Sequence, residues 1–284
     1  MPRTESQFKI ETETSIEAEI DPDLGQKAKA ILDSQEFKKL FKDAVHEFND
    51  KEGIGLPLKD DGRIDMGAFR RKLSQRTFSD HLAKCQEREK ITESIQRKFH
   101  HGSKDFIGEL LERLFFIAFN RAWYNRRFIT LRTAEYDDYV NKIDFLVLDA
   151  ENQYEPFVAI DVTTKGGKVL TEDQKKQLTR EEKGHIEEGE RKLKHIAING
   201  GEIKYGIKLS DGEHGVDVEL TELEKLPAIM VSLNTDDVIK FAGDLLNEDE
   251  HRINDVLEKI KRDIRLRKKT MRSAGVSSQI PRPL

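Results

Sequence analysis

The clearest pattern in the chain is a helical stripe of apolar residues between Lys104 and Tyr124. Its members recur at i, i+3, i+4 and i+7 spacing, so they share one face of a helix: Ile107, Leu110, Leu111, Leu114 and Ala118. The pattern predicts a helix that lies at the centre of the packing.

Three apolar segments after this helix indicate strands. They are Arg127–Ala134, Lys142–Asp149 and Pro156–Thr164, and polar turns at Glu135–Asn141 and Ala150–Glu155 separate them. In the second and third segments the apolar residues are continuous, which is typical of strands that are covered on both faces.

Periodicity also predicts elements on either side of this unit. One or two amphipathic helices are expected in Gly25–Asp50, a loop in Lys51–Met66 and charged helical sequence in His81–Phe99. A helix at Leu170–Ile198, strands at Glu202–Leu209 and Ala228–Leu233, and a last helix at Glu248–Arg267 are expected after the three strands.

The order of these elements predicts an α/β sandwich with a mixed sheet. We divide the chain into a disordered acidic tail (1–24), a helical region (25–103), an α/β core (104–247), and a basic helix with a disordered tail (248–284).

Composition narrows the class of protein. Apolar and charged residues each make up 36% of the chain, no apolar run approaches the roughly 20 residues of a membrane span, and Cys85 is the single cysteine. These features predict a cytoplasmic protein without disulfides or a multi-cysteine zinc site. The net charge of −5 is located in residues 1–24, so the rest of the chain is electrically balanced.

Two carboxylates stand in or beside apolar strands. Asp144 lies two residues into the second predicted strand, and Asp161 ends the apolar run of the third. A buried carboxylate is costly unless it is paired or binds a cation. Lys165 can lie on the same strand face as Asp161. Magnesium takes oxygen ligands, stabilises the charge of a phosphodiester and activates water, so two acids and a lysine suffice for phosphodiester hydrolysis.

The region from Lys104 to Ile198, about a third of the chain, resembles the PD-(D/E)XK nuclease superfamily. The resemblance rests on Gly108-Glu109-Leu110-Leu111-Glu112 in the helix, Lys142-Ile143-Asp144-Phe145-Leu146 in one strand and Ile160-Asp161-Val162-Thr163 in the next. It implies a restriction-endonuclease-like fold with mixed sheet and flanking helices. It also implies Mg²⁺ or Mn²⁺ held by Asp144, Asp161 and the Val162 carbonyl, with Glu112 supporting a metal-bound water or a second ion.

The sequence departs from the family at the lysine. Thr163 stands where the family's lysine falls, so we assign that role to Lys165, with Lys168, Lys175 and Lys176 as alternatives. The departure bears on activity more than on fold.

The C-terminal segment is rich in lysine and arginine, which suits contacts to phosphates. Together with Lys168, its Arg265, Lys268 and Lys269 are the expected nucleic-acid contacts. A solvated helix end is the competing interpretation.

The combined interpretation is a magnesium-dependent nuclease that acts on DNA rather than RNA, with a homodimer as an open alternative. Three other interpretations remain. The protein could be an inactive nucleic-acid-binding or assembly protein, or a charged helical scaffold without a site. The acids could also pair with ordinary neighbours: Asp144 and Asp161 with Lys142 and Arg127, and Glu112 with Arg113 or Lys104.

Overall fold

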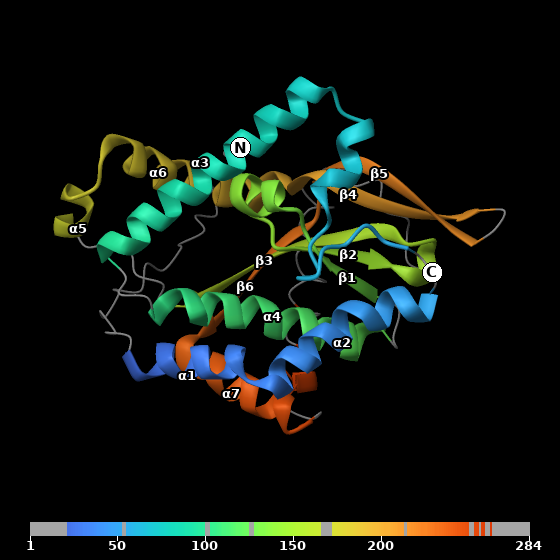
Figure 1. Cartoon of the computed structure of the whole chain (residues 1–284), viewed down its shortest axis with the longest axis horizontal. Coiled ribbons are helices and arrows are strands. Elements are labelled where there is room, and N and C mark those ends of the chain that lie inside the picture. Colours follow the sequence, from blue (N-terminus) through green and yellow to red (C-terminus); the bar gives the residue numbers. More distant parts are fainter. Residues whose placement is uncertain are drawn as a thin grey trace, which may run out of the picture.

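The structure of the chain is a computed structural model. The structure describes residues 22–52, 55–99, 103–124, 128–165, 172–212 and 215–249, together with residues 253–255, 257–258 and 262. Figure 1 shows the arrangement of its helices and strands. Residues 1–21 of the expected acidic tail and most of the basic C-terminal segment fall outside these residues.

Four strands form a mixed sheet in the order β1-β2-β3-β6. Strands β1 (Phe128–Arg132), β2 (Phe145–Asp149) and β3 (Glu155–Lys165) are antiparallel neighbours, and β6 (Ala228–Asn234) runs parallel to β3. The expected α/β fold with a mixed sheet is therefore confirmed. Strands β4 (Gly201–Gly212) and β5 (Gly215–Leu226) pair as a separate antiparallel hairpin.

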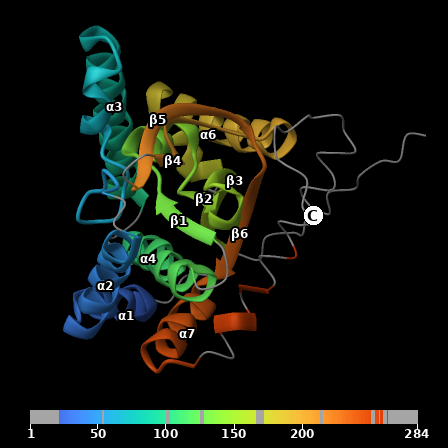
Figure 2. The ribbon, with the colours of Figure 1, turned by 90° about the vertical axis from the view of Figure 1, so that its right-hand side faces the viewer.

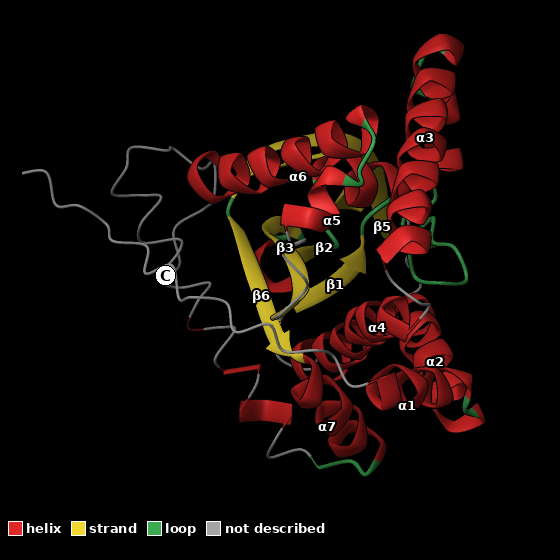
Figure 3. Ribbon diagram, turned by 90° about the vertical axis from the view of Figure 1, so that its left-hand side faces the viewer, coloured by secondary structure: helices red, strands yellow, loops and turns green. Residues whose placement is uncertain are grey.

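Helices cover both faces of the four-stranded sheet (Figure 2). Helices α1 (Pro22–Asp33), α2 (Gln35–Glu52), α4 (Ser103–Tyr124) and α7 (Thr235–Leu246) lie on one side. Helices α3 (Gln75–Phe99) and α6 (Arg180–Asn199) lie with the β4–β5 hairpin on the other side, and the short α5 (Glu172–Lys176) precedes α6 (Figure 3). Each side has its own apolar core.

Helix α4 is the central packing helix, as its stripe predicts. Its residues from Leu114 to Phe119 are all buried, and they pack against α1, α2, α7 and the sheet. Buried Asn120 fixes α4 to the sheet, because its side chain donates to the carbonyl of Thr130 and accepts from the N–H of the same residue. These two bonds satisfy backbone groups on the edge of β1 that faces away from β2, where no strand of the described residues lies.

Several boundaries differ from the expectation. Helix α1 begins at Pro22, so residues 22–24 are its first turn, where proline is well tolerated. Residues 142–144 precede β2, because Lys142 has a left-handed conformation and ends a π-helical turn at Asp137–Asn141. This turn replaces the polar loop expected there, and Asp137 within it is fully buried. The helix expected at Leu170–Ile198 is divided into α5 and α6.

Strand β5 and helix α7 were not expected. Among the described residues, no helix is long and apolar enough to cross a membrane.

Candidate active site

Asp144 lies directly before β2 and is bound to β3 through both backbone and side chain. Its N–H donates to the carbonyl of Ile160 at 3.0 Å. Its carboxylate accepts a 2.6 Å hydrogen bond from the N–H of Val162. The last β2–β3 pair is Phe145–Ile160, so the carboxylate takes the place of a backbone acceptor just beyond the ladder. The backbone of β3 therefore fixes the position of this side chain.

Asp161 lies within β3, next to Val162, and is paired in register with Met230 of β6. Because Val162 donates to the Asp144 carboxylate, Asp144 is held next to the β3 residue that follows Asp161. The N–H and C=O of one strand residue point to the same edge, so the Val162 carbonyl faces the edge at which Asp144 lies.

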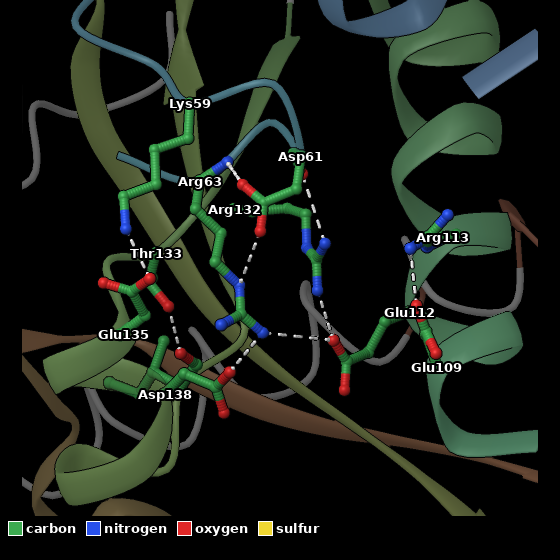
Figure 4. Close-up of polar contacts among 11 residues, drawn as sticks. Lys59, Asp61, Arg63, Glu109, Glu112, Arg113, Arg132, Thr133, Glu135 and Asp138 are labelled. Carbon is green, nitrogen blue, oxygen red and sulfur yellow. Dashed lines mark hydrogen bonds and ion pairs between the residues drawn. The ribbon is translucent and has the colours of Figure 1, made fainter. Parts of the chain in front are cut away.

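Glu112 reaches the same region from α4. It pairs with Arg132 of β1 at 2.5 Å, while Arg113 pairs with Glu109 one turn away (Figure 4). The interpretation of Glu112 as a partner of Arg113 is therefore wrong. Lys104 lies in the part of α4 whose side chains are outside the described residues.

The pKa values place these acids in one electrostatic cluster. Burial, then the negative charges of Glu112, Asp161 and Asp138, raise the pKa of Asp144 well above its ordinary range. Burial raises the pKa of Asp161 to about 7, against the positive charge of Lys142. Burial and Asp138 raise the pKa of Glu112 in spite of its two arginine partners. The site therefore concentrates negative charge that its cations do not fully neutralise.

Asp138 is the fourth acid of this group, and sequence reasoning missed it. We call Glu112, Asp138, Asp144 and Asp161 the acid cluster. The charge of Asp138 raises the pKa of each of the other three members. It is carried by the π-helical turn, a conformation often found at functional sites.

Asp137 anchors that turn from inside. Its buried carboxylate accepts hydrogen bonds from the N–H groups of Lys204 and Tyr205 at 2.7 and 2.9 Å, and from the side chain of Asn141 at 2.7 Å. The turn is thus tied to β4, and this contact fixes the position of Asp138, the next residue in the turn. Burial outweighs these bonds and raises the pKa of Asp137 to about 6.

Arg63 and Arg132 are the cations of the cluster that sequence reasoning missed. Arg63 comes from the loop before α3 and pairs with Asp138 at 2.8 Å (Figure 4). Arg132 also donates to the carbonyl of Asp61 at 3.1 Å. No local signal could have found these pairs, because Arg63 and Asp138 are 75 residues apart.

The lysine expected in the site is described only in part. Thr163 is exposed and pairs in register with Ser232. The backbone of Lys165 pairs with Asn234 at the end of β3, but its side chain lies outside the described residues, as does that of Lys175. Lys176 is an exposed partner of Asp173. Lys142, which the sequence suggested only as a partner of the acids, acts on Asp161.

Four basic residues are the nucleic-acid contacts that the sequence predicts. Lys168, Arg265, Lys268 and Lys269 all lie outside the described residues.

The donor set fits a hard divalent cation. Asp161 lies close enough to Asp144 for its charge to raise the pKa of Asp144, and Val162, whose N–H binds the Asp144 carboxylate, contributes a carbonyl at the same edge; all three groups offer oxygen. Among the described residues, no group of three or more His, Cys, Asp and Glu side chains is arranged to hold a metal. Magnesium usually uses one or two carboxylates and completes its shell with water and phosphate oxygens, so a pair of acids is sufficient.

Comparison of the chain with protein-family models, with curated proteins and with solved structures finds no match. The geometry and charge of the acid cluster are therefore the observations that bear on function.

Proposed function

We propose that the chain is a divalent-metal-dependent nuclease that hydrolyses phosphodiester bonds, in DNA rather than RNA. The observation that carries the proposal is that the Asp144 carboxylate is bound to Val162, the β3 residue next to Asp161, and that the positive charge around the two acids does not offset the rise of their pKa values. When both of these partly buried carboxylates are ionised, they destabilise the fold unless a cation binds.

The arrangement of secondary structure supports a PD-(D/E)XK-like, restriction-endonuclease-like core. Helix α4 is followed by the antiparallel strands β1, β2 and β3, then by α6 and, after the β4–β5 hairpin, by β6 parallel to β3. The two acids stand at the second and third strands, as the resemblance in sequence implies.

Each residue has a definite task in this proposal. Asp144, Asp161 and the Val162 carbonyl would hold Mg²⁺ or Mn²⁺, and the bound ion would supply charge neutralisation at the phosphate and lower the pKa of the attacking water. Glu112, kept in place by Arg132, orients water at the edge of the site. A lysine, Lys165 or Lys142, adds positive charge near the phosphate.

The test compares cleavage of linear and circular DNA by the wild type and by Asp144→Ala, Asp161→Ala and Glu112→Gln, with Mg²⁺, Mn²⁺ or EDTA. We expect loss of about 100-fold or more in each variant and no cleavage in EDTA. Glu109→Gln is the matched control, since Glu109 is a neighbouring α4 acid that is more exposed and paired with Arg113, and it should retain full activity. Unchanged cleavage in Asp144→Ala and Asp161→Ala refutes the proposal.

One observation favours a second function, a nucleic-acid-binding protein that has lost catalysis. Thr163 replaces the lysine of the family and is exposed on β3. Calorimetric titration with Mg²⁺ separates the two functions, because the nuclease requires binding that disappears in Asp144→Ala. Absence of such binding, with DNA still retained in a gel-shift assay, supports the inactive protein.

A further inference from the structure

The guanidinium of Arg63 stands between two members of the acid cluster. It pairs with Asp138 at 2.8 Å and approaches Glu112 at 3.9 Å from the other side (Figure 4). A third carboxylate, that of Asp61, lies 3.6 Å from its Nε. Only 15% of the side chain is exposed, so the group is largely removed from water.

The backbone holds Arg63 in this position. Arg63 forms a parallel bridge with Arg132, and the N–H of Ile64 donates to the carbonyl of Arg132 at 3.0 Å. The N–H of Lys59 closes the loop by donating to the carbonyl of Arg63 at 2.8 Å. The loop from Lys59 to Ile64 is therefore docked on the outer edge of β1. These backbone bonds, and not the acids themselves, direct the side chain of Arg63 toward the acid cluster.

The charges of the region leave room for one divalent ion. Among the described residues, the interacting groups are five acids (Asp61 and the acid cluster) and three cations (Arg63, Arg132 and Lys142), so the fully ionised site carries two surplus negative charges. Burial would lower the pKa of Arg63, but the negative charges of Asp138, Glu112 and Asp61 raise it, so the guanidinium stays charged.

We propose that Arg63 occupies the position between Glu112 and Asp138 that a second divalent cation would take, so that the site binds a single ion at Asp144 and Asp161. This inference rests on the metal site of the proposed function. The guanidinium is planar, always charged and weakly hydrated, which suits it to a fixed place between carboxylates. In two-ion sites the two metal ions, which stand roughly 3.5–4 Å apart, together neutralise the carboxylates around them. Here the guanidinium of Arg63 neutralises part of that negative charge in place of one ion.

The proposal predicts the number of ions bound. Calorimetric titration with Mn²⁺ alone should give one bound ion per chain for the wild type and two for Arg63→Met. The methionine keeps an apolar stem but removes the positive charge. Electron paramagnetic resonance of Arg63→Met should show the coupling of two neighbouring Mn²⁺ ions. Arg63→Gln serves as a second variant if Arg63→Met does not fold, and circular dichroism establishes folding for both.

Two further variants make the assignment specific. The double variant Arg63→Met/Asp138→Asn should return to one ion, because it loses a carboxylate of the opened position. Arg113→Met removes another α4-linked ion pair and should leave one ion. One ion in both Arg63 variants, or two in the wild type, overturns this inference and leaves the nuclease proposal intact. No Mn²⁺ bound by the wild type overturns both.

Discussion

The N–H of Val162 donates a hydrogen bond to the carboxylate of Asp144 over 2.6 Å. Through this bond the backbone of β3 positions an acid that belongs to the segment before β2. The separation of Asp144 from Asp161 therefore depends on the sheet rather than on flexible side-chain contacts. Such positioning by rigid elements is what a metal or catalytic site requires.

Replacement of Asp144 by Asn should stabilise the metal-free protein. The pKa of Asp144 is raised, so the folded state disfavours its ionised form, and at about pH 8 that form destabilises the fold. Asn removes the charge and still offers an oxygen to Val162. We expect the melting temperature in EDTA to rise by a few degrees, since 1 kcal/mol corresponds to about 2–4 °C in a chain of this size. A lower melting temperature contradicts the account of the charge.

Lys142→Met should raise the pKa of Asp161 further. The positive charge of Lys142 favours the carboxylate of Asp161 and partly offsets burial. Titration of the metal-free protein by carboxyl-carbon NMR should give a value near 7 in the wild type and a higher value in the variant. Lys176→Met, which removes an exposed lysine paired with Asp173, should leave the titration unchanged. Equal curves for wild type and Lys142→Met would show that this lysine does not act on Asp161.

Asp137→Ala should destabilise the fold strongly. The substitution leaves the buried N–H groups of Lys204 and Tyr205 without their acceptor. Loss of these bonds should lower the free energy of unfolding by about 3 kcal/mol, measured by urea denaturation. Asp137→Asn should cost less, because its amide oxygen can still accept one bond. The exposed Asp217→Ala is the control and should have little effect.

Glu182 should make the protein sensitive to acid. Its pKa is lowered to about 2, first by the hydrogen bond from Lys98, so the folded state holds the carboxylate more firmly than the unfolded chain does. The stabilisation is complete above the ordinary pKa of 4.5 and is lost as the pH falls from there toward 2.

The measurement is the difference in the free energy of unfolding between wild type and Glu182→Gln. This difference should shrink between about pH 5 and about pH 2. The pKa of His185 is lowered to about 4, chiefly by burial, so His185 also reduces the stability of the fold as the pH falls from 6.5 to 4. Both proteins share this effect, so it cancels in the difference. Glu181→Gln, an exposed neighbour on α6, should follow the wild type throughout. A difference that does not vary with pH rules out this role for Glu182.

Patterns within single elements predicted much of the fold. The stripe of α4 and the apolar strands β2 and β3 are local signals, and the structure contains all three. Strand β5 and helix α7 also carry signals that could have been used. Apolar residues alternate in Val216, Val218 and Leu220 of β5, and those of α7 have helical spacing: Val238, Phe241, Ala242 and Leu245.

The candidate site was predictable only where its residues follow local patterns. Asp144 and Asp161 stand out because they interrupt or end apolar runs. Asp138 does not, since it lies in a polar segment that resembles an exposed loop and becomes partly buried through the anchor of Asp137. The partners of Glu112 depend on which strand α4 packs against, and Arg113, the neighbour in sequence, proved to belong to Glu109.

The docking of the Arg63 loop on β1 sets a lower limit to the size of an independent unit. A fragment that starts at Ser103 would carry the whole acid cluster but lose one of its cations, and it would expose Phe116, which packs against Phe41 of α2. The excess negative charge of the acid cluster would favour unfolding, and the exposed aromatic surface would favour aggregation. For expression or transplantation, the segment that begins at α1 and continues through α7 is therefore best treated as indivisible.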